Sequence, residues 1–142
     1  MTSPAGAFVA RSARQKPVHA EPIHRAHLLR RPTVTVAEWL TVQTTTDSRD
    51  KALALARGAV DARVAACAQV GGPIASVYRW QGETETAEEW QVSFKTVGAR
   101  YEELEAYIKG AHDYDTPEII ATAVVRGSAE YLDWVAEETA VR

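Results

Sequence analysis

Apolar positions along this chain recur with two different periods, which predict a fold that mixes strands and helices. Residues 33–46 are rich in Val, Thr and Trp, a composition typical of a strand. Asp47 or Ser48 then supplies a helix N-cap, and Asp50 adds a carboxylate in the first turn. The helix that follows is expected to bury residues spaced three or four apart: Leu53, Ala56, Val60 and Val64.

The middle of the chain predicts strands joined by turns. Residues 65–70 form a short apolar strand, and Gly71-Gly72-Pro73 is expected to turn the chain. Residues 74–81 and 90–97 alternate between apolar and polar, with a polar turn over residues 82–86. Aromatic residues on both arms indicate a long hairpin, in which cross-strand pairs hold the register. One helix layer cannot cover so long a hairpin, so we expect it to pair with another subunit.

The last third of the chain repeats the helix-then-strand order. Residues 98–112 have helical periodicity, residues 119–125 form an apolar strand, and Gly127-Ser128 precedes a short closing helix. A helix that twice separates strands predicts an α+β fold of ferredoxin-like type. We therefore expect an antiparallel sheet with helices on one face.

The N-terminal residues differ from the rest of the chain in charge. Residues 1–33 carry a net charge of +5, four prolines and no sustained period, which predicts a disordered basic tail outside the fold. An arginine-rich, acid-poor start is also typical of an organelle transit peptide. Residues 34–142 form the expected domain and carry a net charge of −8. An acidic domain is a poor candidate for nucleic-acid binding and suits cations instead.

The length of the apolar runs and the number of cysteines further restrict the class of protein. No window approaches the roughly 18 consecutive apolar residues of a membrane helix, so no membrane span is expected. The single cysteine, Cys67, lies in an apolar segment and is expected to be buried and inert. One thiol forms no internal disulfide, which favours a reducing, cytoplasmic setting.

Titratable residues concentrate at one predicted helix-to-strand junction. His112, Asp113, Asp115 and Glu118 lie there with Tyr114, just around a proline that ends the helix. Imidazole and carboxylate groups are metal ligands, so these four are the candidate metal residues. Other interpretations stay open: His112 as a helix C-cap, Glu118 holding Lys95 or an imidazole across a subunit interface, or a polar turn without chemistry.

Several short motifs follow one another in a recognisable order, and over about residues 36 to 138 the chain resembles CutA, the divalent-cation tolerance family. These motifs are Val64-Ala65-Ala66-Cys67-Ala68, Tyr78-Arg79-Trp80-Gln81-Gly82, Lys95-Thr96, His112-x-Tyr114-x-x-Pro117-Glu118-Ile119-Ile120 and Tyr131-Leu132-x-Trp134. The resemblance implies a ferredoxin-like subunit, a homotrimer with strands paired between subunits, and a link to copper and other divalent cations.

The resemblance also implies which residues bind copper, and this chain departs from that pattern. The family's cysteine corresponds to Thr44 and its two adjacent histidines to Ala111 and His112, so only His112 is kept. A thiolate that would select Cu(I) is missing. The remaining candidate ligands are harder donors than a thiolate: His112, Asp113, Asp115 and Glu118. Cu(II) or Zn(II) is therefore the expected cation, and its binding is expected to depend on His112.

Three function classes follow from this resemblance and these residues, beside the further interpretation of a structural trimer with no ligand. The first is a non-enzymatic homotrimer that binds a divalent cation. The second is a signalling trimer, similar to the PII proteins, with a small-molecule effector at the subunit clefts. The third is a hydrolase that uses His112 and Glu118 as an acid–base pair, although the chain has neither GxSxG nor GxxxxGK[ST]. We expect no enzymatic activity.

Overall fold

The computed structural model describes residues 37–142, so the expected tail over residues 1–33 lies outside the described residues. The described chain forms four strands and three α-helices, with one 3₁₀ turn. In chain order they are β1 (Trp39–Thr46), α2 (Arg49–Asp61), β2 (Cys67–Trp80), β3 (Glu83–Val97), the 3₁₀ turn η2 (Gly98–Arg100), α3 (Tyr101–Ala111), β4 (Ile120–Ala123) and α4 (Ala129–Glu138).

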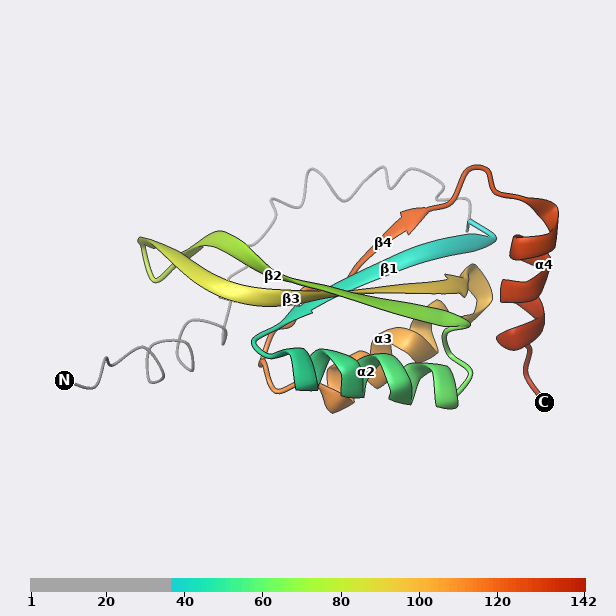
Figure 1. Ribbon diagram of the computed structural model, residues 1–142, viewed down its shortest axis with the longest axis horizontal. Coiled ribbons are helices and arrows are strands. Elements are labelled where there is room, and N and C mark those ends of the chain that lie inside the picture. Colours follow the sequence, from blue (N-terminus) through green and yellow to red (C-terminus); the bar gives the residue numbers. More distant parts are fainter. Residues whose placement is uncertain (1–36) are drawn as a thin grey trace, which may run out of the picture.

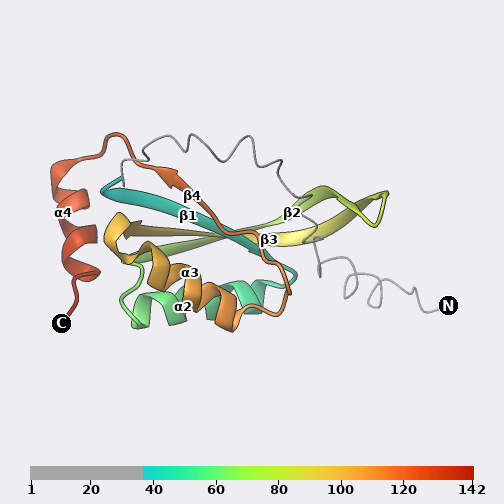
Figure 2. The ribbon, with the colours of Figure 1, turned by 180° about the vertical axis from the view of Figure 1, so that it is seen from behind.

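The sheet confirms the predicted α+β, ferredoxin-like class. Its strand order is β2-β3-β1-β4, and every neighbouring pair is antiparallel. Helices α2 and α3 lie side by side on one face of the sheet, as Figures 1 and 2 show from opposite sides. The closing helix α4 does not join them, because it stands across the end of the sheet (Figure 1).

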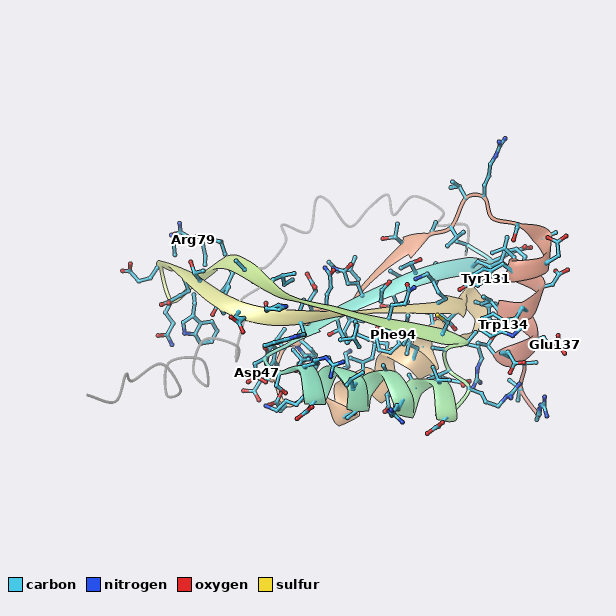
Figure 3. The ribbon with its side chains drawn as sticks, in the orientation of Figure 1. Asp47, Arg79, Phe94, Tyr131, Trp134 and Glu137 are labelled. Atoms are coloured by element: carbon cyan, nitrogen blue, oxygen red, sulfur yellow. The ribbon has the colours of Figure 1, made fainter. Side chains whose placement is uncertain are left out.

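The core lies between the sheet and the two helices α2 and α3. On this face Val42 of β1 is paired with Phe94 of β3, and both are fully buried. Leu104 and Ile108 of α3 are also fully buried in the same cluster. Figure 3 shows the position of Phe94 between the sheet and the helices. Burying such side chains contributes about 1.5–3 kcal/mol each, so this layer is the main source of stability.

Helix α2 begins as predicted, and its buried face agrees with the predicted one only in part. Ser48 is the N-cap, and its side chain accepts a hydrogen bond from the Lys51 amide. The buried residues are mostly alanines, at i, i+3, i+4 and i+7: Ala52, Leu55, Ala56 and Ala59. Of the four residues predicted to be buried, Ala56 and Val64 are buried, whereas Leu53 is half-buried and Val60 is 37% exposed. Small side chains bring the helix axis close to the sheet, and the larger Leu53 and Val60 then border a groove beside β2.

Gly71-Gly72-Pro73 does not turn the chain, contrary to the prediction. Residues 67–80 form one strand, with an irregularity in its register between Gly71 and Ile74. Gly72 has φ of +146°, and a Cβ there would meet the Trp90 ring at 2.8 Å. The three residues therefore form a bulge that lets the Trp90 side chain lie against the backbone.

The turn of the hairpin is also shorter than predicted. Trp80 pairs with Glu83, so only Gln81 and Gly82 connect the strands. Both have positive φ, 48° and 80°, as a two-residue hairpin turn of this twist requires. The arms of β2 and β3 continue beyond the rest of the sheet as a projecting ribbon (Figure 1).

The second face of the sheet is polar and not covered by α2 or α3. Gln43 of β1 is paired with Ser93 of β3, and Lys95 is paired with Cys67 of β2. Cys67 is partly exposed on this face, which differs from the expected burial. We call this surface the open face. Within residues 37–142, no helix is long and apolar enough to cross a membrane.

Candidate functional site

The predicted junction is real: it follows α3 and leads into β4. His112 is the C-cap of α3, with extended backbone (φ −82°, ψ 143°), and its amide closes the last turn by donating to the Ile108 carbonyl at 2.9 Å. Pro117 then excludes helix and favours extended chain towards β4. His112 is therefore the C-cap residue of α3 by its backbone, while its ring contacts Thr45 and Tyr114 and not the last carbonyls of the helix.

The His112 imidazole is fully buried and uses both of its nitrogens inside the chain. Nε2 lies 2.8 Å from the Thr45 carbonyl oxygen and donates to it. Nδ1 lies 3.0 Å from the Tyr114 amide nitrogen and accepts its hydrogen bond. The side chain has 0% exposure. These two bonds join the end of α3 to β1, so the ring acts as a structural bridge between the two layers.

Tyr114 continues this bridge into β3. Its ring centroid lies 4.4 Å from that of His112, and its hydroxyl donates to Glu89 Oε2 at 3.0 Å. Tyr114 is 6% exposed and Glu89 only 2%. Burial, reinforced by the Glu89 carboxylate, raises the pKa of the Tyr114 phenol. The phenol therefore stays protonated and remains a hydrogen-bond donor.

Asp113 points to the opposite side, towards the start of α2. Lys51 Nζ donates to Asp113 Oδ2 at 2.6 Å and to Asp47 Oδ1 at 2.8 Å. The hydrogen bond with Asp113, followed by that with Asp47, raises the pKa of Lys51. Figure 3 places Asp47 where β1 leads into α2. The ammonium group thus holds two carboxylates together, beside a cavity of about 210 Å³ that His112 and Asp113 border.

Glu118 differs from the other acids of the junction because one of its oxygens lacks a partner. Its Oε2 atom is buried and has no hydrogen bond within the described part of the chain, and the same holds for Thr45 Oγ1. Continuing the β1–β4 register past its last pair, Gln43 with Ile120, brings Glu118 level with Thr45. A buried carboxylate oxygen without a donor is costly, so this position calls for a ligand or a partner.

The four predicted metal residues are not gathered into one centre. His112 is a bridge, Asp113 is bound to Lys51, Asp115 lies on the surface and Glu118 lies at the entry to β4. Across residues 37–142, no group of three or more His, Cys, Asp or Glu side chains could hold a metal ion. Of the other positions linked to copper by resemblance, Thr44 is fully buried and Ala111 is exposed.

Three residues of this site were missed by the sequence interpretation. Lys51 and Asp47 lie four apart at a helix start, a spacing that signals an ion pair. The contact of Lys51 with Asp113 spans 62 residues and has no local signal. Glu89 likewise looked like one of several acids in a polar stretch, and only the tertiary contact with Tyr114 distinguishes it.

Comparison with known proteins agrees with this fold and these motifs. The sequence pattern of the family described as CutA1 divalent ion tolerance protein matches residues 40–138. The chain belongs to the CutA1 divalent ion tolerance family. This confirms the resemblance drawn from the motifs.

Two relatives illustrate the range of the CutA family. The divalent-cation tolerance protein CutA of Thermus thermophilus is 37% identical over 95 residues, which cover 67% of this chain and 92% of that protein. The chloroplastic protein CutA of Arabidopsis thaliana is 33% identical over 100 residues, 70% of this chain. The match spans only 55% of the plant protein's own length.

Solved structures of the CutA family share the fold. CutA1 of Thermus thermophilus superimposes with a TM-score of 0.70 at 35% identity, covering 72% of this chain and 99% of that one. CutA of Xylella fastidiosa gives a TM-score of 0.71 at 32% identity, covering 73% and 100% of the two chains. The ferredoxin-like architecture of the described residues is thus the architecture of the family.

Proposed function

We propose that this CutA chain is a divalent-cation tolerance protein that binds its cation through carboxylates, while His112 keeps its structural role. The observation that supports this most is the state of the imidazole, whose two nitrogens both have partners inside the chain. Ligation by His112 would break a bond to Thr45 or to Tyr114. Asp113 is 49% exposed, and Glu118 keeps an unpartnered oxygen, so these carboxylates are the available ligands.

The donor set bears on which cation is bound. Carboxylate oxygens suit harder ions, whereas Cu(I) requires the soft thiolate that Thr44 does not supply. We propose Zn(II) or Cu(II) rather than Cu(I), bound by carboxylates of the junction (Asp113, Asp115 or Glu118) from more than one subunit, since one copy does not bring three of them together. A cation at Asp113 has to displace Lys51, whose ammonium now occupies the Oδ2 atom.

Calorimetric titration of the full chain with Zn(II) and Cu(II) tests this proposal. Asp113→Asn and Glu118→Gln should each weaken affinity about tenfold, a loss of about 1.4 kcal/mol. Lys51→Met should strengthen it, because the competing ammonium is gone. His112→Gln should leave affinity nearly unchanged while lowering the melting temperature. If His112→Gln abolishes binding and the carboxylate variants do not, the opposite prediction, that binding depends on His112, is correct.

We also propose that the chain works as a homotrimer. In the part of the chain that the structure describes, no strand lies beside the outer sides of the edge strands β2 and β4, and all four residues of β4 are exposed. Pairing of β4 from one copy with β2 of the next is a head-to-tail contact, which closes into a ring when the rotation allows. The open face and the projecting hairpin offer further surface for contacts between subunits. Sedimentation equilibrium should give three times the chain mass; a stable monomer would refute the proposal.

The same geometry favours a non-enzymatic role over the hydrolase alternative. A general base needs a nitrogen or oxygen that can take up a proton next to the substrate. The His112 ring is fully buried, and its Nδ1 already accepts from the Tyr114 amide. An acid–base pair of His112 and Glu118 would first have to dismantle the bridge between α3 and β1.

A further inference from the structure

A second cavity lies at the opposite end of the sheet, between the sheet and α4. It has a volume of about 260 Å³, and its walls are mostly apolar. Sites for drug-sized ligands usually have about 300–1,000 Å³, so this cavity suits a smaller, metabolite-sized molecule. Figure 3 shows Tyr131 at this end of the sheet. Six of the lining residues matter here: Trp39, Lys95, Arg126, Tyr131, Leu132 and Val135.

The charge of this cavity is opposite to that of the domain. Its two charged lining residues, Lys95 and Arg126, are both cationic, and no described acidic residue lines it. The domain over residues 34–142 has a net charge of −8. A local positive potential on an acidic surface selects for an anionic ligand.

Lys95 has one donor left for such a ligand. Its Nζ donates to Gln69 Oε1 at 3.2 Å and to Ser93 Oγ at 3.3 Å, both neutral acceptors. An ammonium group carries three N–H donors, so two are used and one remains. None of the described carboxylates forms a hydrogen bond or ion pair with Lys95. A hydrogen bond from a cation to a carboxylate is about twice as strong as one between neutral groups.

Two other polar groups of the wall, those of Trp39 and Tyr131, already have partners. Trp39 Nε1 donates to the Leu132 carbonyl at 2.9 Å, which fixes the start of β1 against α4. Burial, followed by a hydrogen bond with the Cys67 thiol, raises the pKa of the Tyr131 phenol. The wall is therefore preorganised, with an apolar body and a cationic rim.

We propose that this cavity binds a small organic acid whose apolar or aromatic body lies against Trp39, Leu132 and Val135. Its carboxylate accepts from the third N–H of Lys95, with Arg126 close by at the rim. The site is separate from the junction around His112 and does not depend on cation binding there.

Calorimetric titration of the full chain with phenylacetate and its neutral isostere phenylacetamide tests this site. Wild type should prefer phenylacetate at least tenfold, and Lys95→Met should lose that preference. Lys109→Met is the matched control, because Lys109 lies on α3 and pairs with Glu105. It should keep the preference. Melting temperature and native mass, measured for each variant, establish that the variants fold and assemble like wild type.

Three results would overturn the proposal. The first is no phenylacetate binding by wild type at millimolar concentration. The second is equal binding of the two probes, or a preference that survives in Lys95→Met. The third is binding of phenylacetate only by Glu118→Gln. This would mean that the Glu118 carboxylate of a neighbouring copy, held by Lys95 across the subunit interface, already fills the cavity.

Discussion

The two faces of the sheet differ in what covers them. The face towards α2 and α3 carries Val42, Val92 and Phe94, all at 0% exposure. The open face carries Gln43, Ser93 and Lys95 on the same strands, one residue out of step. Because strand residues alternate, one set of residues folds the subunit, whereas the other is available for assembly and binding. Stability and function are thus encoded at neighbouring positions of β1 and β3.

The largest expected effect is the loss of stability caused by a substitution on the covered face. Phe94→Ala removes the largest fully buried side chain and should lower the free energy of unfolding by about 3–5 kcal/mol. Gln43→Ala, opposite Ser93 on the open face, should change it by less than about 0.5 kcal/mol. Urea denaturation of both variants gives the comparison. Similar losses in the two would mean that the faces do not divide the roles in this way.

A second, smaller effect concerns two fully buried threonines on the covered face. Thr96 Oγ1 donates to the Val64 carbonyl at 2.8 Å, whereas Thr44 Oγ1 has no partner within the described residues. Thr96→Val should therefore cost about 1–3 kcal/mol, because a buried carbonyl loses its donor. The same substitution at Thr44 should be neutral or stabilising by up to about 1 kcal/mol.

The CutA resemblance implies a cysteine at the position of Thr44, and we propose this as the reason why Thr44 Oγ1 has no partner within the described residues. A thiol behaves as a small apolar group and needs no hydrogen bond, so a pocket shaped for it leaves a hydroxyl unsatisfied. Thr44→Cys should then be at least as stable as wild type in thermal unfolding. A destabilised Thr44→Cys would show that the hydroxyl has a favourable contact after all.

The sequence predicted the order of the elements because alternation and helical periodicity are local signals. For α2 it predicted the burial of Ala56 and Val64 correctly but not that of Leu53 and Val60, because closeness to the sheet favours small side chains such as Ala52. Gly71-Gly72-Pro73 has the composition of a turn, yet the partner strand β3 holds it as a bulge. Only tertiary contacts decide such cases.

The residues of the candidate site were predicted from the sequence, but their roles were not. His112 and the neighbouring acids do lie at one junction, as their sequence proximity required. The two bonds of the imidazole depend on Thr45, which is 67 residues away, and on the path of the backbone at Tyr114. Neither contact leaves a local pattern, so a ligand and a structural bridge look alike in the sequence.

The smallest expected effect is on the solvent side of α3, where Glu105 pairs with Lys109. Lys109, followed by Tyr101, lowers the pKa of Glu105 through hydrogen bonds. A lowered pKa means that this stabilisation is present above the unfolded-state value and is lost as pH falls through the folded-state value. Glu105→Gln should cost about 0.3–0.5 kcal/mol at neutral pH, and the difference from wild type should vanish in acid. A difference that persists in acid would mean that packing, not charge, is responsible.

The central claim is that the outer edges of the sheet, which residues 37–142 of one subunit leave unpaired, are covered by other copies. Amide hydrogen exchange of residues 120–123 tests it most directly, because within residues 37–142 no strand lies beside the outer edge of β4. The proposed trimer predicts slow exchange along β4, comparable to that of β1, and faster exchange when the protein is diluted below its assembly concentration. Fast exchange along β4 at every protein concentration would contradict the account.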